Sequence, residues 1–84
     1  MTIGTNHREK QAMTDFAPTY LLLGRLMQDC EYYLGAGRRC KNHLWALGEE
    51  AQIKKMRELY SQLPVKPEWL SLEQIEQYAA QMVP

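Results

Sequence analysis

The sequence lacks an excess of either charge, and this absence limits the partners that the whole molecule attracts. Ten lysines and arginines offset ten aspartates and glutamates, so the formal net charge is zero at pH 7. A neutral molecule has no overall field that draws it towards nucleic acid or an anionic membrane. Any charged contact must therefore come from a local cluster of residues.

Long apolar runs and a leader are also missing. No run approaches the ~20 residues that a membrane-spanning helix needs, so we expect no membrane partner. The N-terminus has neither the apolar region nor the small-residue cleavage site of a signal peptide, which predicts a cytoplasmic protein. A reducing cytoplasm keeps thiols reduced, so the two cysteines, Cys30 and Cys40, are predicted to be free.

Residues that favour β-strands are scarce. The chain has only two valines, and no stretch alternates apolar with polar residues as a half-buried strand does. Apolar residues instead recur at steps of three and four over residues 18–34, 48–63 and 71–82, which is the helical period. We therefore predict an all-α fold, a small three-helix bundle with an irregular basic loop between the first and second helices.

The length bounds the organisation of the chain. Eighty-four residues make one domain with a small core and little room to enclose a substrate pocket. Residues 1–14 are polar and show no sustained period, so we expect a flexible N-terminal segment there. Residues 15–84 are predicted to form a single helical domain.

The helix ends carry recognisable signals. Pro18 suits the first turn of the first helix, and Gly35, which tolerates the positive φ of a common helix stop, is expected to end it. Gly37 is expected to set the turn of the loop that follows. Ser71 and Gln74 have the spacing of a capping box at the start of the third helix. The inward faces are expected to hold Leu22, Leu23, Leu26, Met27, Cys30, Tyr33 and Leu34 in the first helix, Ile53, Met56, Tyr60 and Leu63 in the second, and Leu72, Ile75, Tyr78, Ala79 and Met82 in the third.

Two pairs of apolar residues lie outside the helices. Leu44 and Trp45 follow the loop, and Trp69 and Leu70 follow a connection that contains two prolines. Large apolar side chains near helix ends most often pack, so we expect both pairs to fold back onto the core.

The loop "GAGRRCKNHLWALG", residues 35–48, holds the local excess of charge. Arg38, Arg39 and Lys41 are its only charged residues, whereas residues 15–34 and the last twenty residues each carry a net charge of −2. One interpretation is a solvated surface that pairs with those neighbours. Another is contact with nucleic-acid phosphates, with an aromatic residue of the loop stacked on a base. The glycines lack the Gly-Lys-Ser/Thr ending of a P-loop and predict no nucleotide site.

An incomplete set of metal ligands overlaps the loop. Cys40 and His43 are separated by two residues, which suits two ligands of one turn, and Cys30 is the only other thiol. A structural zinc site takes four ligands, so a fourth would have to come from His7 or an acid such as Asp29. Cys30 also falls on the apolar face of the first helix, where a buried free cysteine is common. We predict no cofactor and keep zinc as an alternative.

No catalytic constellation stands out. A cysteine with a histidine can form a nucleophile and its base, but nothing in the sequence fixes such a geometry. The local signatures of known cysteine enzymes are absent. We therefore expect no enzymatic activity.

Two longer segments, "YLLLGRLMQDCEYYLGAGRRCKNHLW" and "IKKMRELYSQLPVKPEWLSLEQIEQY", together resemble a known family, the large polyvalent protein-associated domain 11. The residues that carry the resemblance are Asp29, Cys30, Tyr32 or Tyr33, Leu34, Gly35, Leu44, Trp45, Ile53, Met56, Pro67, Trp69 and Leu70. The resemblance implies a protein of phages or conjugative elements, made in the cytoplasm of a bacterial host. It supplies no catalytic residues.

Small proteins of mobile elements often act by binding a host protein, for example as anti-CRISPR or anti-restriction inhibitors. By that context we expect a non-enzymatic interaction protein that binds a host or element protein. Arg38, Arg39 and Lys41 are the predicted contact residues, because arginine is enriched at interface hot spots. The alternatives are a nucleic-acid-binding accessory module that uses the same loop, and a zinc-stapled structural module.

Overall fold

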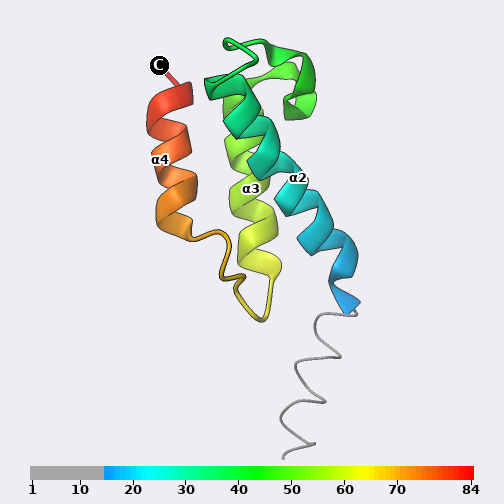
Figure 1. The fold of residues 1–84 in the computed structure, drawn as a ribbon. Helices are drawn as coiled ribbons and strands as arrows, with labels where there is room; N and C mark the ends of the chain where they lie inside the picture. The colour runs from blue at the N-terminus through cyan, green and yellow to red at the C-terminus, as the bar shows by residue number, and fades with distance from the viewer. Residues whose placement is uncertain (1–14) are drawn as a thin grey trace, which may run out of the picture.

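Three α-helices and two short 3₁₀ helices make up residues 15–84, the part of the chain that this computed structural model describes (Figure 1). They follow one another as α2 (Ala17–Leu34), η1 (Lys41–His43), η2 (Trp45–Leu47), α3 (Glu49–Gln62) and α4 (Leu72–Met82). Residues 15–84 contain no strand, so the predicted all-α three-helix bundle is confirmed. The flexible segment predicted for residues 1–14 lies outside the described residues.

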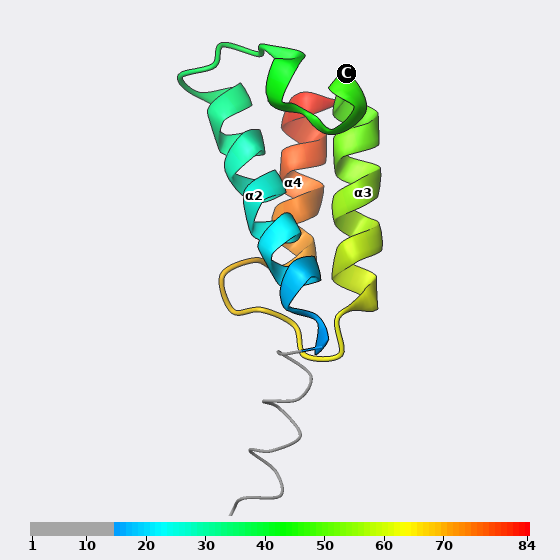
Figure 2. The ribbon, with the colours of Figure 1, turned by 90° about the vertical axis from the view of Figure 1, so that its right-hand side faces the viewer.

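The three α-helices run side by side, and α3 packs against both α2 and α4 (Figures 1 and 2). Residues 35–48, here called the 35–48 connection, cross one end of the bundle between α2 and α3. Residues 63–71, called the 63–71 linker, lie at the opposite end, close to the start of α2. The two irregular segments therefore form separate surfaces at opposite ends of the molecule.

One cluster of buried side chains fills the space between the helices. Its members come from the three α-helices, the connection and the linker: Leu23, Leu26, Cys30, Tyr33, Leu44, Ile53, Met56, Leu59, Leu63, Leu70, Ile75 and Met82. Most of the predicted inward positions are thereby confirmed. Leu72 is an exception, because it is 50% exposed at the first position of α4, where Leu70 of the linker occupies the core instead.

In each of the two apolar pairs outside the α-helices, only one of the two residues is buried as predicted. Leu44 and Leu70 are buried in the core. Trp45 and Trp69 remain 40% and 43% exposed. The prediction that both tryptophans return to the core is therefore wrong, and the exposed indoles become candidates for contact with a partner.

The start of α4 follows from its sequence. The Gln74 backbone N–H donates to Ser71 Oγ over 3.1 Å, and the Ser71 N–H donates to Gln74 Oε1 over 2.9 Å. Both halves of the predicted capping box are present, so two N–H groups that the first turn leaves free are satisfied.

α2 ends at Leu34 with Gly35 as its C-cap, as predicted, but the backbone conformation of Gly35 is not the one expected. Gly35 has a φ of −116°, so it does not end the helix in the left-handed conformation. The glycine that the turn does require is Gly37. A Cβ at Gly37 would lie 2.5 Å from the Tyr32 ring and 2.7 Å from the Tyr32 carbonyl oxygen, which leaves no room for a side chain.

Polar side chains tie α4 to the other two helices. Arg57 of α3 forms a two-pronged pair with Glu76 of α4, with Nε–Oε2 and Nη2–Oε1 distances of 2.7 and 2.5 Å. The Tyr78 hydroxyl of α4 donates to Glu31 of α2 over 3.0 Å. These contacts fix α4 against α2 and α3 on the surface, while Ile75 and Met82 pack inside.

Candidate functional site

The 35–48 connection has a defined backbone rather than an open loop. Its N–H groups bond to nearby carbonyls, as in Arg38 N to Gly35 O (3.1 Å) and Arg39 N to Tyr33 O (2.7 Å). Its non-glycine residues with positive φ are Arg38 (48°), Arg39 (64°), Ala46 (51°) and Leu47 (58°). Left-handed backbone at such residues costs free energy and persists only where surrounding contacts hold it.

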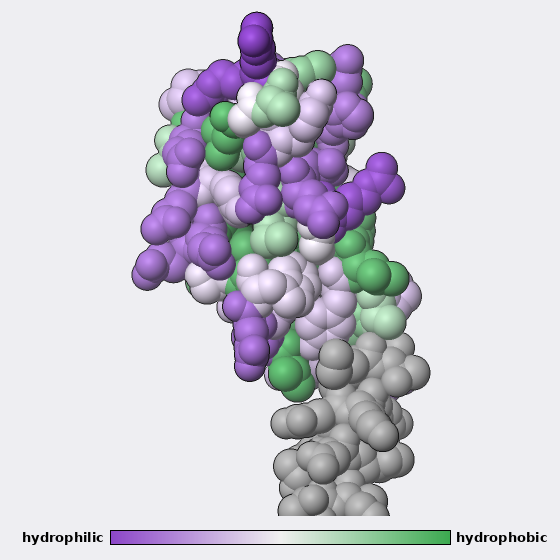
Figure 3. Space-filling model, viewed as in Figure 1, coloured by the Kyte–Doolittle hydropathy of each residue, from purple (hydrophilic) through white to green (hydrophobic). Residues whose placement is uncertain are grey.

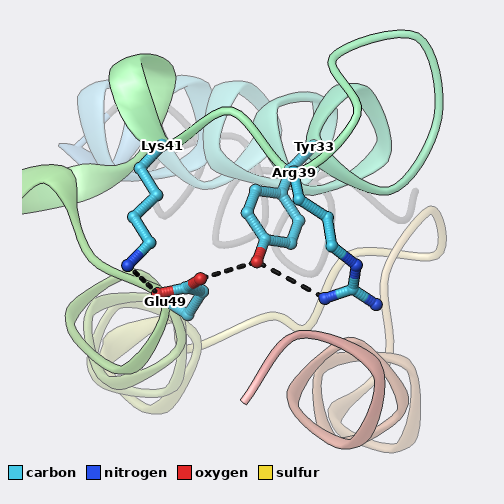
Figure 4. A network of polar contacts seen from close by, with 4 residues as sticks. All are labelled: Tyr33, Arg39, Lys41 and Glu49. Carbon is cyan, nitrogen blue, oxygen red and sulfur yellow. Dashed lines mark hydrogen bonds and ion pairs between the residues drawn. The ribbon is translucent and has the colours of Figure 1, made fainter. Parts of the chain in front are cut away.

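Arg39 and Lys41 provide some of those contacts through one polar network (Figure 4). The Tyr33 hydroxyl donates to one carboxylate oxygen of Glu49 over 2.6 Å, and Lys41 Nζ lies 3.4 Å from the other. Arg39 Nη1 donates to the Tyr33 hydroxyl over 3.4 Å, and Arg39 Nη2 donates to the Gln81 carbonyl over 2.9 Å. The network thus joins the connection to α2, α3 and α4.

The network keeps its charges compensated. The hydrogen bond from Tyr33, with a further contribution from Lys41, lowers the pKa of the Glu49 carboxyl. The same hydrogen bond raises the pKa of Tyr33, because an ionised phenol would face a carboxylate. Glu49 therefore stays ionised at neutral pH and offsets part of the positive charge of the connection.

The three predicted contact residues do not share one environment. Arg39 and Lys41 are engaged with other elements of the same chain. Arg38 is exposed and forms no ion pair within residues 15–84. Of these three residues, Arg38 is therefore the one whose side chain has no hydrogen bond or ion pair to another part of residues 15–84.

The three candidate zinc ligands are not brought together. Cys30 is buried, its Sγ donates to Met56 Sδ over 3.5 Å, and burial raises its pKa to about 11. Cys40 is exposed, and His43 lies edge-on to the Tyr32 ring with 5.1 Å between ring centroids. Within residues 15–84, no three His, Cys, Asp or Glu residues cluster as a metal site requires. Both cysteines are free thiols, as predicted.

The opposite end of the bundle holds a feature that sequence reasoning missed. An apolar groove of about 560 Å³ lies between the start of α2 and the 63–71 linker. Its lining residues are Ala17, Tyr20, Leu21, Val65, Lys66, Pro67, Glu68 and Trp69, and we call it the Trp69 groove. In Figure 3 the lower end of the described bundle shows pale and green surface, while strongly hydrophilic residues dominate the upper part.

Contacts between the linker and the rest of the bundle fix the walls of the Trp69 groove. The Tyr20 hydroxyl donates to the Val65 carbonyl and fixes the linker against α2. The Trp69 ring lies over Gly24, where a Cβ would stand 3.7 Å from the indole, an ordinary contact distance. Leu70 is buried immediately after Trp69 and anchors the linker. The two prolines of "PVKPEWL" are the sequence signal that could have indicated this wall, since they keep the linker out of a helix.

Comparison with known proteins adds the family. The model of the large polyvalent protein-associated domain 11 matches residues 16–82, which include all three α-helices, the connection and the linker. The chain belongs to this family. No curated protein and no solved structure gave a significant match. Membership associates the chain with phages or other mobile elements. Domains of this kind are not known as enzymes.

In this member of the large polyvalent protein-associated domain 11 family, several of the residues that carried the resemblance have a packing role. Cys30, Leu44, Ile53, Met56 and Leu70 are all buried in the core. Trp45 and Trp69 differ, because both belong to the pattern and both are exposed. No helix of the described residues is long and apolar enough to cross a membrane.

Proposed function

We propose that this mobile-element protein acts by binding another protein, of the host or of the element, through the Trp69 groove. The observation that carries the proposal is the exposed apolar groove itself, with an indole in its wall. Exposed apolar patches of this kind are typical of interaction sites, and tryptophan is enriched among interface hot spots. The proposal requires no cofactor and no catalytic residue.

The groove suits binding because its parts are already in place. Leu21 is 75% exposed, and Val65 is also exposed, so apolar surface is available before any partner arrives. Tyr20 and Leu70 hold the two walls, as described above. A preformed site loses little conformational freedom on binding, which favours affinity.

Arg38 is the residue of the basic cluster that we propose as a further contact. It is exposed, and no ion pair within residues 15–84 uses its charge. Nucleic-acid binding through the cluster has less support, because Arg39 and Lys41 already contact other elements.

A host defence component is the partner class that we propose to test first, because mobile elements are targets of such defences. In that role the protein would be an anti-CRISPR-like inhibitor that occupies a surface of the defence protein. The family membership supports a mobile-element setting, and the Trp69 groove supports a binding role.

The test compares two matched leucines at opposite ends of the molecule. Leu21 lines the Trp69 groove, and Leu47 is exposed on the 35–48 connection. Leu21→Arg and Leu47→Arg introduce the same charge at exposed positions, so both variants should keep their circular dichroism spectrum. Each tagged protein is used to retain partners from a lysate of the bacterial host and of cells that carry the element.

We expect a specific partner that wild type and Leu47→Arg retain and Leu21→Arg loses. Retention by Leu21→Arg together with loss in Arg38→Glu would move the interface to the connection and overturn the assignment of the groove. Arg25→Glu, at an exposed position of α2, is the charge control for Arg38→Glu. For the defence role, a phage that the host restricts should form plaques in cells that express wild type but not Leu21→Arg.

A further inference from the structure

We propose that the Trp69 groove takes a short segment of its partner in which a large apolar side chain stands next to a lysine or arginine. This inference rests on the protein-binding function proposed above and adds the chemistry of the bound segment. The apolar lining would take the first side chain, and Glu68 would take the second.

The size of the groove fits an inserted side chain. Its volume of about 560 Å³ falls within the range of roughly 300–1,000 Å³ that is usual for pockets that enclose compact ligands. Leu21, Val65, Pro67 and Trp69 supply apolar surface on both walls. A single aromatic or large aliphatic anchor would bury that surface, which is the main source of affinity in such contacts.

The one lysine of the lining is not available to a ligand. Lys66 Nζ donates to the Tyr60 carbonyl over 2.7 Å and to the Leu63 carbonyl over 2.8 Å. It also lies 5.0 Å from the centroid of the Tyr60 ring. These carbonyls belong to the C-terminal end of α3, the negative end of the helix dipole, so part of the charge of Lys66 is offset there.

The acids at the groove are not compensated in the same way. Glu68 lines the groove, is exposed, and forms no ion pair within residues 15–84. Asp15 is also exposed and stands two residues before Ala17, which lines the same groove. Because the Lys66 ammonium is bonded to carbonyls at the end of α3, Glu68 is the charged group of the lining that is left to pair with a partner. Charge complementarity at a rim selects partners, and here it selects a basic residue beside the anchor.

The experiment selects peptides on the purified protein from a display library of random short sequences. Trp45→Phe makes Trp69 the sole tryptophan, so its fluorescence reports binding of each synthetic peptide at the groove. Trp45→Phe keeps the backbone N–H that Gln52 binds. We expect the selected peptides to share an apolar residue next to a lysine or arginine.

Variants of the groove separate the two parts of the inference. Leu21→Arg should weaken the selected peptides by about thirtyfold or more, because it places a charge against the anchor. Glu68→Gln should weaken them roughly two- to fivefold, as expected for an exposed charge pair, and Glu68→Lys should reverse the preference from a basic to an acidic neighbour. Glu50→Gln, an exposed acid at the opposite end of α3, is the matched control and should change nothing.

Three outcomes distinguish this inference from the function on which it rests. Peptides that need Leu21 and Glu68 and carry a basic residue support both. Peptides that need Leu21 but bind equally with lysine or glutamate beside the anchor overturn the basic preference and leave the binding function standing. A selection that yields no peptide sensitive to Leu21→Arg overturns both.

Discussion

Gln52 is the buried polar residue on which we expect the bundle and the 35–48 connection both to depend. Its side chain is 0% exposed in the middle of the core. Gln52 Nε2 donates to the Leu26 carbonyl of α2 over 2.8 Å, and Gln52 Oε1 accepts from the Trp45 N–H over 2.6 Å. One amide of α3 therefore joins α2 to the connection. We predict that Gln52→Ala destabilises the protein and loosens the connection.

The magnitude follows from these contacts. Two hydrogen bonds at about 1 kcal/mol each are lost. The Leu26 carbonyl keeps its bond within α2, but the Trp45 N–H loses its partner, which adds roughly 1 kcal/mol or more. The free energy of unfolding should therefore fall by about 3 kcal/mol. A domain of this size has only about 4–12 kcal/mol in total, so the variant should be marginally stable.

The assay is urea unfolding followed by circular dichroism, with Gln77→Ala as the control. Gln77 is exposed on α4, so the same change there should stay within about 0.5 kcal/mol of wild type. In Gln52→Ala the Trp45 indole should become more accessible to a soluble quencher of its fluorescence. The measurement uses Trp69→Phe in the background, so that Trp45 is the fluorescent tryptophan. Equal unfolding midpoints for Gln52→Ala and Gln77→Ala would refute the bridging role.

A carboxyl at the same position tests the environment by its pH dependence. In Gln52→Glu one oxygen can still accept from Trp45, but an ionised carboxylate would face the Leu26 carbonyl. Burial therefore raises the pKa of the new carboxyl in the folded state. The free energy of unfolding of Gln52→Glu is then highest below the unfolded-state pKa of about 4.3 and falls as pH rises through the folded-state pKa. Stability that does not change across that window would contradict a dry, amide-bridged core.

Three further predictions concern the ends of the helices and the polar network, each checked by urea unfolding. Ser71→Ala removes the cap of α4 and should cost about 1 kcal/mol; a cost near zero would mean that the cap contributes nothing. Gly37→Ala should cost about 1–3 kcal/mol, because the methyl group meets the Tyr32 carbonyl, and an unchanged midpoint would refute that clash. Tyr33→Phe removes the main cause of the lowered pKa of Glu49, so it should be less stable than wild type at neutral pH. That deficit should narrow as pH falls through the folded-state pKa of Glu49, and a deficit constant with pH would assign the loss to packing.

The helices could be predicted because their signals are local. The apolar period of α2 and the capping box at Ser71 each lie within one element, and both are present in the structure. The backbone conformation of Gly35 could not be predicted from its residue type. The expected turn at Gly37 does need a glycine, but the reason lies in the Tyr32 ring and carbonyl, which only the folded turn brings next to it.

The polar network was predictable only in part, because its partners lie far apart in the sequence. Pairing of the basic loop with an acidic neighbour was one of the interpretations, and Lys41 does pair with Glu49. Arg39 instead contacts Tyr33 of α2 and the carbonyl of Gln81 in α4. No local pattern in the sequence links these residues. In the structure, two of the three basic residues of the loop contact the α-helices, which the sequence alone does not indicate.

The Trp69 groove was not predicted because the sequence does not indicate which of two neighbouring apolar residues is buried in the core. Leu44 stands beside Trp45, and Leu70 stands beside Trp69, but adjacent side chains in a non-helical segment point in different directions. In both pairs the leucine is buried and the indole remains at the surface.

The two exposed indoles are nevertheless not equivalent as binding sites. Lys55 Nζ lies 5.2 Å from the centroid of the Trp45 ring, so a cation of the same chain already covers one face of that indole. Trp69 instead forms the wall of an open groove that is also lined by Glu68. A partner would have to displace Lys55 to stack on Trp45, whereas among residues 15–84 no charged side chain covers Trp69 in this way. For this reason Trp69, rather than Trp45, is the residue around which the main partner surface should be sought.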